Sequence, residues 1–323
     1  MTEEEEKKES LPDLEENLSS LRDGGPVQET RLTLESRMTF ECHPGVSCFT
    51  ACCNNIDIML TPYDVLRMKQ RLDLSSTDFV EKYTRSAIEE KTGLPQLFLR
   101  MEENEKRSCP FVTPEGCSIY TDRPSMCRYY PVGQAVHRIE KDGEIVNDEF
   151  FMLIREPHCK GFEEGERTWT IAEWRENQDA AHYDEMHRRW KDLFMRQGEH
   201  SRDMDETRQA LFFLASYDLD RFRRYVFESD FLKVILIDQQ TQDRIRDDEL
   251  ELMKFAIRYL NYAFGIEESF SIDSEVAKER VARAREKEEA ADIAAEQAAG
   301  APADGAGSVP SQGDPADLAG PDS

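Results

Sequence analysis

The sequence predicts an α+β protein, mainly helical, in which an irregular cysteine-rich domain with a β-hairpin is followed by a helical bundle. Two observations support this prediction. All eight cysteines and most of the prolines lie before residue 160. From about Thr170 to Gly265 there is no cysteine, and apolar residues recur at the spacing of amphipathic helices. We therefore expect the cysteine chemistry in the first half and helix packing in the second.

Composition divides the chain into five parts. Both ends lack aromatic residues and are rich in polar or small ones, so they cannot bury enough apolar surface to fold. We predict a disordered acidic N-terminus at 1–36, a cysteine-cluster domain at 37–175 and a helical domain at 176–272. A charged helix, rich in Ala, Glu, Lys and Arg, is expected at 273–298, and a disordered tail at 299–323.

Within the cysteine-rich domain, local patterns predict four regular elements. Thr61-Pro62 is typical of an N-cap followed by proline in the first helical turn. A second helix begins at Ser75 or Ser76 and is expected to reach Ala87. Alternating apolar residues favour a strand at 96–101, and 135–155 favours a β-hairpin with its turn at Lys141-Asp142-Gly143.

The helical domain opens with a capping-box pattern at Thr170-Ile171-Ala172-Glu173. The periodicity predicts that this helix continues past Trp190 to Phe194. Further helices are predicted at 204–215, 218–227, 231–238 and 247–264.

The formal net charge of −26 at pH 7 argues against nucleic acid or an anionic membrane as a partner, because both require a basic face. The short basic runs at 187–189 and 221–224 lie in acidic helical patterns and are expected to be solvated. No apolar run approaches the roughly 18 residues of a membrane span, and the glutamate-rich start does not resemble a signal peptide. The sequence thus predicts a soluble, cytoplasmic protein, for which a protein partner or substrate remains a candidate.

The cysteines form two clusters and one outlier. In a chain with no secretory signal, clustered thiols are more typical of metal ligands than of disulfides. Thiolates are soft ligands that suit zinc, iron or an iron–sulfur cluster, which they hold in sets of four. The candidate metal ligands are Cys42, Cys48, Cys52, Cys53, Cys109, Cys117, Cys127 and Cys159.

Eight thiols can fill two four-ligand sites, or one site with a redox or structural remainder. Cys52 and Cys53 are adjacent, and neighbouring side chains point apart in extended backbone. Their sulfurs are therefore expected to face different sites, unless one of them bridges. His43 and His158 each adjoin a cysteine and are secondary candidates. The other four histidines are expected at the surface: His137, His182, His187 and His200.

Other functions compete with metal binding. Some cysteines could be inert buried residues, or the vicinal pair could exchange disulfides. A thiol enzyme is disfavoured, because the C-x5-R pattern after Cys127 fails at Gly133. An interaction module, in which the helices recruit a partner and the metal only staples the fold, is compatible with metal binding. The sequence assigns no catalytic residue and no cofactor-binding residue.

The most specific stretch runs from Cys117 to Pro131 and has the form C-x-I-Y-x-x-R-P-x-x-C-R-x-x-P. With Cys48-x3-Cys52-Cys53 and Cys109-Pro110-Phe111 before it and Cys159-Lys160-Gly161 after it, this stretch resembles the YkgJ-type family of cysteine-cluster proteins. That family is also described as a zinc- or iron-chelating domain and includes the flagellin lysine N-methylases. The resemblance extends from about Phe40 to Gln178, and the first gap, Cys42-x5-Cys48, is longer than the family spacing.

The resemblance implies that the cysteines are the metal ligands, position for position. It also implies an alternative function, an S-adenosylmethionine-dependent protein lysine N-methyltransferase, although no G-x-G-x-x-G motif follows a strand. Arg123 and Arg128 of the shared block are expected to bind loop carbonyls near the thiolates, or alternatively an anionic substrate.

Overall fold

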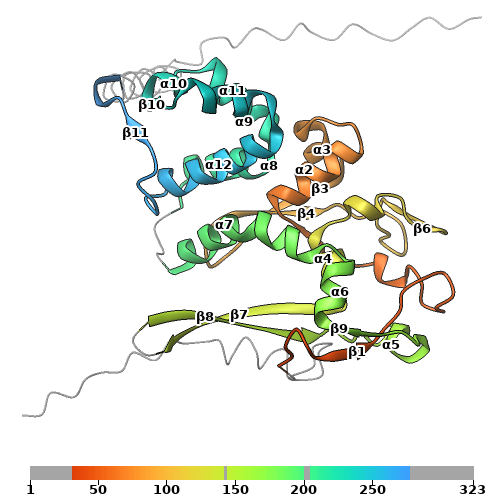
Figure 1. The fold of residues 1–323 in the computed structure, drawn as a ribbon. Coiled ribbons are helices and arrows are strands. Elements are labelled where there is room, and N and C mark those ends of the chain that lie inside the picture. The colour runs from red at the N-terminus through yellow and green to blue at the C-terminus, as the bar shows by residue number, and fades with distance from the viewer. Residues whose placement is uncertain (1–30, 142–143, 200–203, 277–323) are drawn as a thin grey trace, which may run out of the picture. The chain divides into compact units, whose positions relative to one another are not determined.

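The computed structural model describes residues 31–141, 144–199 and 204–276 (Figure 1). The described residues up to Ser271 form one compact unit, and those from Ile272 belong to a second. The first unit has mixed α+β structure, with small sheets and all the cysteines in its N-terminal part and mostly helices after residue 160, which confirms the predicted fold class. The predicted tail lies outside the described residues, as do most of the predicted N-terminal segment and charged helix.

The first two predicted helices are present. Helix α2 (Pro62–Arg71) begins at the Thr61 capping box with Asp64, and α3 (Ser76–Tyr83) begins at the N-cap Ser75. The expectation that the second helix reaches Ala87 is wrong. The Thr84 hydroxyl donates to the carbonyl of Val80 at 2.6 Å, and the chain then continues as strand β3 (Thr84–Ile88).

The sheets of the first half are small. Strand β3 pairs with β4 (Pro95–Leu99), which is the predicted strand shifted by one residue at its start, and β4 pairs with β2 (Met59–Leu60). Two further antiparallel pairs hold the cysteine-bearing loops: β1 (Arg37–Thr39) with β9 (Thr168–Thr170), and β5 (Val112–Thr113) with β6 (Gly116–Cys117). The short helices of this half are η1 (Ala51–Cys53), η2 (Tyr120–Asp122), α4 (Ser125–Tyr129) and α5 (Gly161–Glu164).

The predicted hairpin is formed by β7 (Val132–Lys141) and β8 (Glu144–Leu153), whose last pair is Lys141 with Glu144. The turn residues Asp142 and Gly143 lie outside the described residues. Leu32 pairs with Phe151 on this ribbon, and Arg31 donates to Asp148 of the same strand. The carbonyls of Leu34 and Ser36 instead accept from the N–H groups of Ala172 and Ile171.

Phe40 lies at the centre of the core that supports the first cysteines. Its side chain is 1% exposed, and its ring lies 5.3 Å from that of Trp174 and 4.9 Å from that of Phe162. Burial of one such side chain contributes about 1.5–3 kcal/mol. The same core includes Met38, Val132, Phe151, Leu153, Trp169 and Ile171. It therefore fixes the chain immediately before Cys42 and immediately after Cys159.

The capping box at Thr170 is present and opens α6 (Ile171–Asn177). The predicted single helix to Phe194 is wrong, because the chain breaks at Asp179, which has a φ of 54°. Aspartate tolerates this left-handed conformation better than most residues do. Helix α7 (Ala180–Glu199) then begins, and the break leaves Gln178 free to contact the cysteine-rich half.

The remaining helices form the second half of the unit. The predictions at 204–215 and 218–227 correspond to α8 (Glu206–Tyr217) and α9 (Leu219–Glu228). The predicted helix at 231–238 is too long: α10 (Phe231–Val234) gives way to the extended β10 (Ile235–Leu236).

The region after β10 holds a helix that the sequence prediction missed. The Asp238 side chain caps a new helix, α11 (Gln239–Asp247), and Asp248 caps α12 (Glu249–Ala263). The chain then reaches β11 (Ser271–Ile272). None of the helices in the described part of the chain combines the length and apolar character needed to cross a bilayer.

Candidate metal centre

The eight cysteines gather in two sets of four. We name Cys42, Cys48, Cys52 and Cys159 the first cysteine group, and Cys53, Cys109, Cys117 and Cys127 the second cysteine group. All eight are free thiols, and each group has one exposed member, Cys42 and Cys127 respectively.

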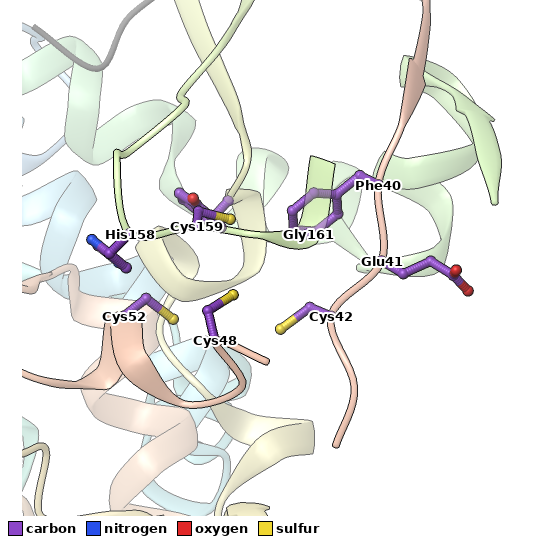
Figure 2. A pocket seen from close by; sticks show the side chains of 9 residues that line it. Phe40, Glu41, Cys42, Cys48, Cys52, His158, Cys159 and Gly161 are labelled. Carbon is purple, nitrogen blue, oxygen red and sulfur yellow. The ribbon is translucent and has the colours of Figure 1, made fainter. Parts of the chain in front are cut away.

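The four residues of the first cysteine group line one pocket, together with Tyr130 and the backbone around Gly161. Figure 2 shows the sulfurs of Cys42 and Cys52 directed toward Cys48, with the sulfur of Cys159 on the other side of the same space. Two backbone N–H groups approach these sulfurs: Lys160 donates to Cys48 at 3.0 Å, and Gly161 donates to Cys159. The turn that begins α5 therefore supplies a ligand candidate and two hydrogen-bond donors at once.

The thiols of the first cysteine group also influence one another electrostatically. Burial raises the pKa of Cys42 to about 11, and the nearby thiols of Cys52, Cys48 and Cys159 add to the increase. Burial also raises the pKa of Cys159, against the opposite effect of the Tyr130 hydroxyl. That hydroxyl is buried and makes no hydrogen bond of good geometry to a described residue, but it is close enough to Cys159 to favour its thiolate.

The second cysteine group is assembled by short-range backbone contacts. The N–H of Cys109 donates to the carbonyl of Cys53 at 2.8 Å, and Val112 pairs with Cys117 across β5 and β6. Burial raises the pKa of Cys109 to about 11, and the backbone N–H groups of Phe111 and Val112 oppose this increase. Cys117 accepts likewise from the N–H of Ile119.

Cys127 completes the second cysteine group from helix α4. Desolvation by the surrounding protein raises the pKa of Cys127, and the nearby thiols of Cys109 and Cys117 raise it further. The residue is nevertheless partly exposed to solvent. Helix α4 is held in place by the fully buried Asp64. Its carboxylate accepts hydrogen bonds from the backbone N–H of Ser125 at 2.8 Å and from the Ser125 hydroxyl at 2.9 Å.

Cys52 and Cys53 connect the two groups. They lie in the 3-10 turn η1, so the expected extended backbone is absent. The Cys53 thiol hydrogen-bonds to the sulfur of Cys52, which lowers the pKa of Cys52 and raises that of Cys53. Cys52 lines the pocket of the first cysteine group and acts on Cys42 and Cys159, and its effect also reaches Cys127. Cys53 interacts with Cys109 and Cys127. The vicinal pair thus belongs to both groups, one residue to each.

Arg123 and Arg128 are buried beside the second cysteine group and bind carbonyl oxygens, as the structural alternative predicted. Arg123 donates to the carbonyl of Tyr120 and to the Gln178 side chain, and Arg128 donates to the carbonyl of Gln178 at 2.8 Å. Within the described residues neither guanidinium forms an ion pair with a carboxylate. Burial lowers the pKa of Arg123, and Tyr120, whose ring lies 3.8 Å from its guanidinium, opposes this together with the thiols of Cys127 and Cys117.

His43 and His158, the secondary candidates, contact other groups than the sulfurs, although His158 also lines the pocket of the first cysteine group. The imidazole of His158 points away from the sulfurs in Figure 2 and lies 3.2 Å from Glu156, and His43 accepts from the N–H of Gly45. The expectation that His187 lies at the surface is wrong. His187 is 1% exposed, because its Nε2 lies 2.7 Å from the Thr61 hydroxyl in the packed interface of α2 and α7.

As they stand, no three cysteine, histidine or acidic side chains of the described residues are placed to hold a metal ion directly. The sulfurs would have to draw together on binding. The donor set still fits a metal, because each group offers four thiols, backbone N–H donors and no competing histidine. A tetrathiolate zinc ion or an iron–sulfur cluster requires ligands of this kind.

Comparison with known proteins supports the same chemistry. Residues 41–171 match the model of the CxxCxxCC family, described as "Putative zinc- or iron-chelating domain". Over these residues the chain is therefore similar to the cysteine-cluster domains of the YkgJ type, for which zinc or iron chelation is described. Neither a curated protein nor a solved structure shows significant similarity to the chain.

Proposed function

We propose that the two cysteine groups each bind one metal centre, zinc or an iron–sulfur cluster, and that these centres hold the N-terminal half of the protein in its fold. One observation carries the proposal: backbone N–H groups donate to Cys48, Cys109, Cys117 and Cys159, and the buried Arg123 lies near Cys127 and Cys117. Burial raises the pKa of most of these thiols, whereas N–H donors and a nearby cation oppose that increase and so favour the thiolate, the form of cysteine that binds metals.

The backbone donors are the first support. A neutral thiol is a weak acceptor and does not require an N–H group, whereas a metal-bound thiolate gains from each one. Cys109, Cys117 and Cys159 each accept from an N–H two residues further along the chain, and Cys109 also accepts from the next one. In each of these tight turns, backbone N–H groups contact one side of the cysteine sulfur and leave the other side available to a metal.

The buried arginine is the second support. Arg123 is 7% exposed, and an unpaired buried charge would destabilise the fold by several kcal/mol. Four thiolates around a divalent ion carry a net charge of about −2 by simple addition of ligand charges. The second cysteine group with its metal would therefore supply the counter-charge that Arg123 lacks among the described carboxylates.

Metal content tests the proposal directly. Protein purified without oxygen should contain either about two zinc ions per chain and no colour, or iron with sulfide and a visible absorption band. Elemental analysis and the absorption spectrum separate these two outcomes. A reduced, folded protein with neither metal would show that the proposal is wrong.

Ligand variants test which residues bind. Cys117→Ser should lower the metal content by about one centre per chain, since serine is a poor ligand for either metal. Glu115→Gln is the matched control, because Glu115 is exposed in the turn of the same β5–β6 hairpin. Equal metal content in the two variants would exclude Cys117 as a ligand.

The methyltransferase alternative stays a prediction of the resemblance alone. Nothing in the described part of the chain favours it over metal binding. Calorimetry with S-adenosylmethionine and the metal-loaded protein is the deciding measurement, and binding would reopen this alternative and the search for a protein substrate.

A further inference from the structure

The two cysteine groups differ in how firmly their ligands are anchored. We propose that the first cysteine group is an exchangeable site, which hands its metal to an acceptor thiolate through Cys42, while the second cysteine group retains its metal as a structural centre. This inference rests on the proposed function, since it requires both groups to bind a metal.

The exposed members of the two groups show the difference. Cys127 lies in helix α4, whose first residue is fixed by the two hydrogen bonds from Ser125 to Asp64. Cys42 lies in coil and begins four consecutive exposed residues that end at Gly45. The chain is anchored just before it at Glu41, whose N–H donates to the carbonyl of Gly161 at 3.1 Å and whose carboxylate accepts from the N–H of Glu166 at 2.8 Å. After it, His43 hydrogen-bonds to Gly45 and Val46 of the same loop. Cys42 can therefore rotate away from a metal without breaking a helix or a sheet.

The positive charge near the two cysteine groups also differs. Among the thiols, Cys127 and Cys117 of the second cysteine group act most strongly on the buried Arg123, which also acts on Cys42. Acidic neighbours do not distinguish the groups, because Glu156 lies near Cys52 and Glu102 lies near Cys109. The second cysteine group therefore has the better compensated negative charge and should hold its metal more tightly.

The first cysteine group is also accessible to an acceptor thiolate. The first cysteine group lines a pocket, and Figure 2 shows Cys42 and His158 on opposite sides of the space around Cys48. Cys42 is the exposed member of this group. An incoming thiolate can reach a metal there beside Cys42. The exchange needs no oxidant or reductant: the acceptor thiol gives up its proton and bonds to the metal, the bond to Cys42 breaks, and the released Cys42 thiolate takes up that proton. Three further exchanges of the same kind, at Cys48, Cys52 and Cys159, complete the transfer.

The test uses the full chain loaded with two zinc ions and challenged with excess chromophoric chelator. We expect one zinc ion to leave roughly ten- to a hundred-fold faster than the other, the range over which groups around metal ligands change affinity. Cys42→Ser should abolish the fast phase and leave the slow phase. Arg123→Gln should accelerate the slow phase and leave the fast one unchanged.

Transfer is separated from simple release by using a reduced four-cysteine peptide as the acceptor. The rate of the fast phase should increase with peptide concentration. A rate independent of the peptide, a single rate for both zinc ions, or loss of the slow phase in Cys42→Ser would each overturn the inference. A chain that cannot be loaded with two zinc ions would instead contradict the proposed function itself.

Discussion

The cysteine-rich half and the helical half of the unit are stabilised in different ways. From Glu41 to Asp57 Val46 alone is buried, and from Arg100 to Ser118 Phe111 alone is buried. By contrast, seven of the residues in α12 are buried, including Leu252, Phe255 and Leu260. Buried apolar side chains are the usual source of folding stability, so the cysteine loops need a different source. A metal ion that cross-links the cysteines would stabilise these loops in place of a hydrophobic core.

Metal removal should therefore affect the two halves unequally, and this is the largest effect we expect. Structural zinc contributes apparent binding free energies of about 10–16 kcal/mol at neutral pH, which become folding free energy where no core exists. After treatment with a strong chelator under reducing conditions, amides at 41–57 and 100–118 should lose protection from hydrogen exchange, while those of α12 keep it. Equal loss of protection in the cysteine loops and in α12 would contradict the comparison.

The sequence predicted the elements that depend on local chemistry. The capping boxes at Thr61 and Thr170 need only residues one turn apart, and both are present. The break at Asp179 and the strand from Thr84 were missed, because each depends on partners distant in sequence: Arg128 contacts the first, and β4 pairs with the second. Tertiary contacts thus override a helical pattern that is continuous in the sequence.

The candidate site was predictable in composition but not in arrangement. Thiol clustering indicated metal binding, and adjacency alone suggested that Cys52 and Cys53 serve different sites. The grouping of Cys42 with Cys159 could not be predicted, because the packing of Phe40 against α5 and α6 brings these residues together. The burial of His187 could not be predicted from the sequence either, because its hydrogen-bond partner Thr61 belongs to another helix.

A core substitution in the helical half should act independently of the metal. Phe222 is 0% exposed, and its ring lies 6.4 Å from that of Phe255. Phe222→Ala should lower the free energy of unfolding by about 3–5 kcal/mol, because it leaves a cavity. Urea unfolding followed by the helical signal measures this loss. Metal content should stay at the wild-type value, and a variant that also lost its metal would show that the halves are not separately stabilised.

The Asp64 network tests how the two halves are joined. Asp64→Ala would leave buried donors of Ser125 and Thr61 without an acceptor, at a cost of about 2–3 kcal/mol. Because Ser125 begins the helix that carries Cys127, metal release from the second cysteine group should accelerate as well. Ser75→Ala is the matched control, since it removes the N-cap of α3, which carries no cysteine. Equal metal release in the two variants would show that Asp64 does not position Cys127.

The smallest expected effect is a pH dependence from His187, which lies in the same interface. Burial lowers the pKa of His187, and the nearby Asp64 carboxylate opposes this only in part. Below the unfolded value of about 6.5 the unfolded chain binds a proton that the folded chain excludes, so the free energy of unfolding decreases as pH falls. The decrease is at most about 1.4 kcal/mol per pH unit for one group, and it vanishes above pH 6.5 or so.

His187→Gln should reduce this slope between about pH 6.5 and 5.5, because glutamine can donate to Thr61 without binding a proton. Thr61→Val separates the proton from the hydrogen bond: it removes the hydroxyl that contacts His187 but keeps the imidazole. It should destabilise the protein at every pH and preserve the slope. The protonation of metal-binding thiolates adds its own slope at low pH, but it is common to all three proteins and cancels in the difference. An unchanged slope in His187→Gln would mean that the packing of α2 against α7 tolerates a charged imidazole, and that this interface, unlike the core of α12, opens to water.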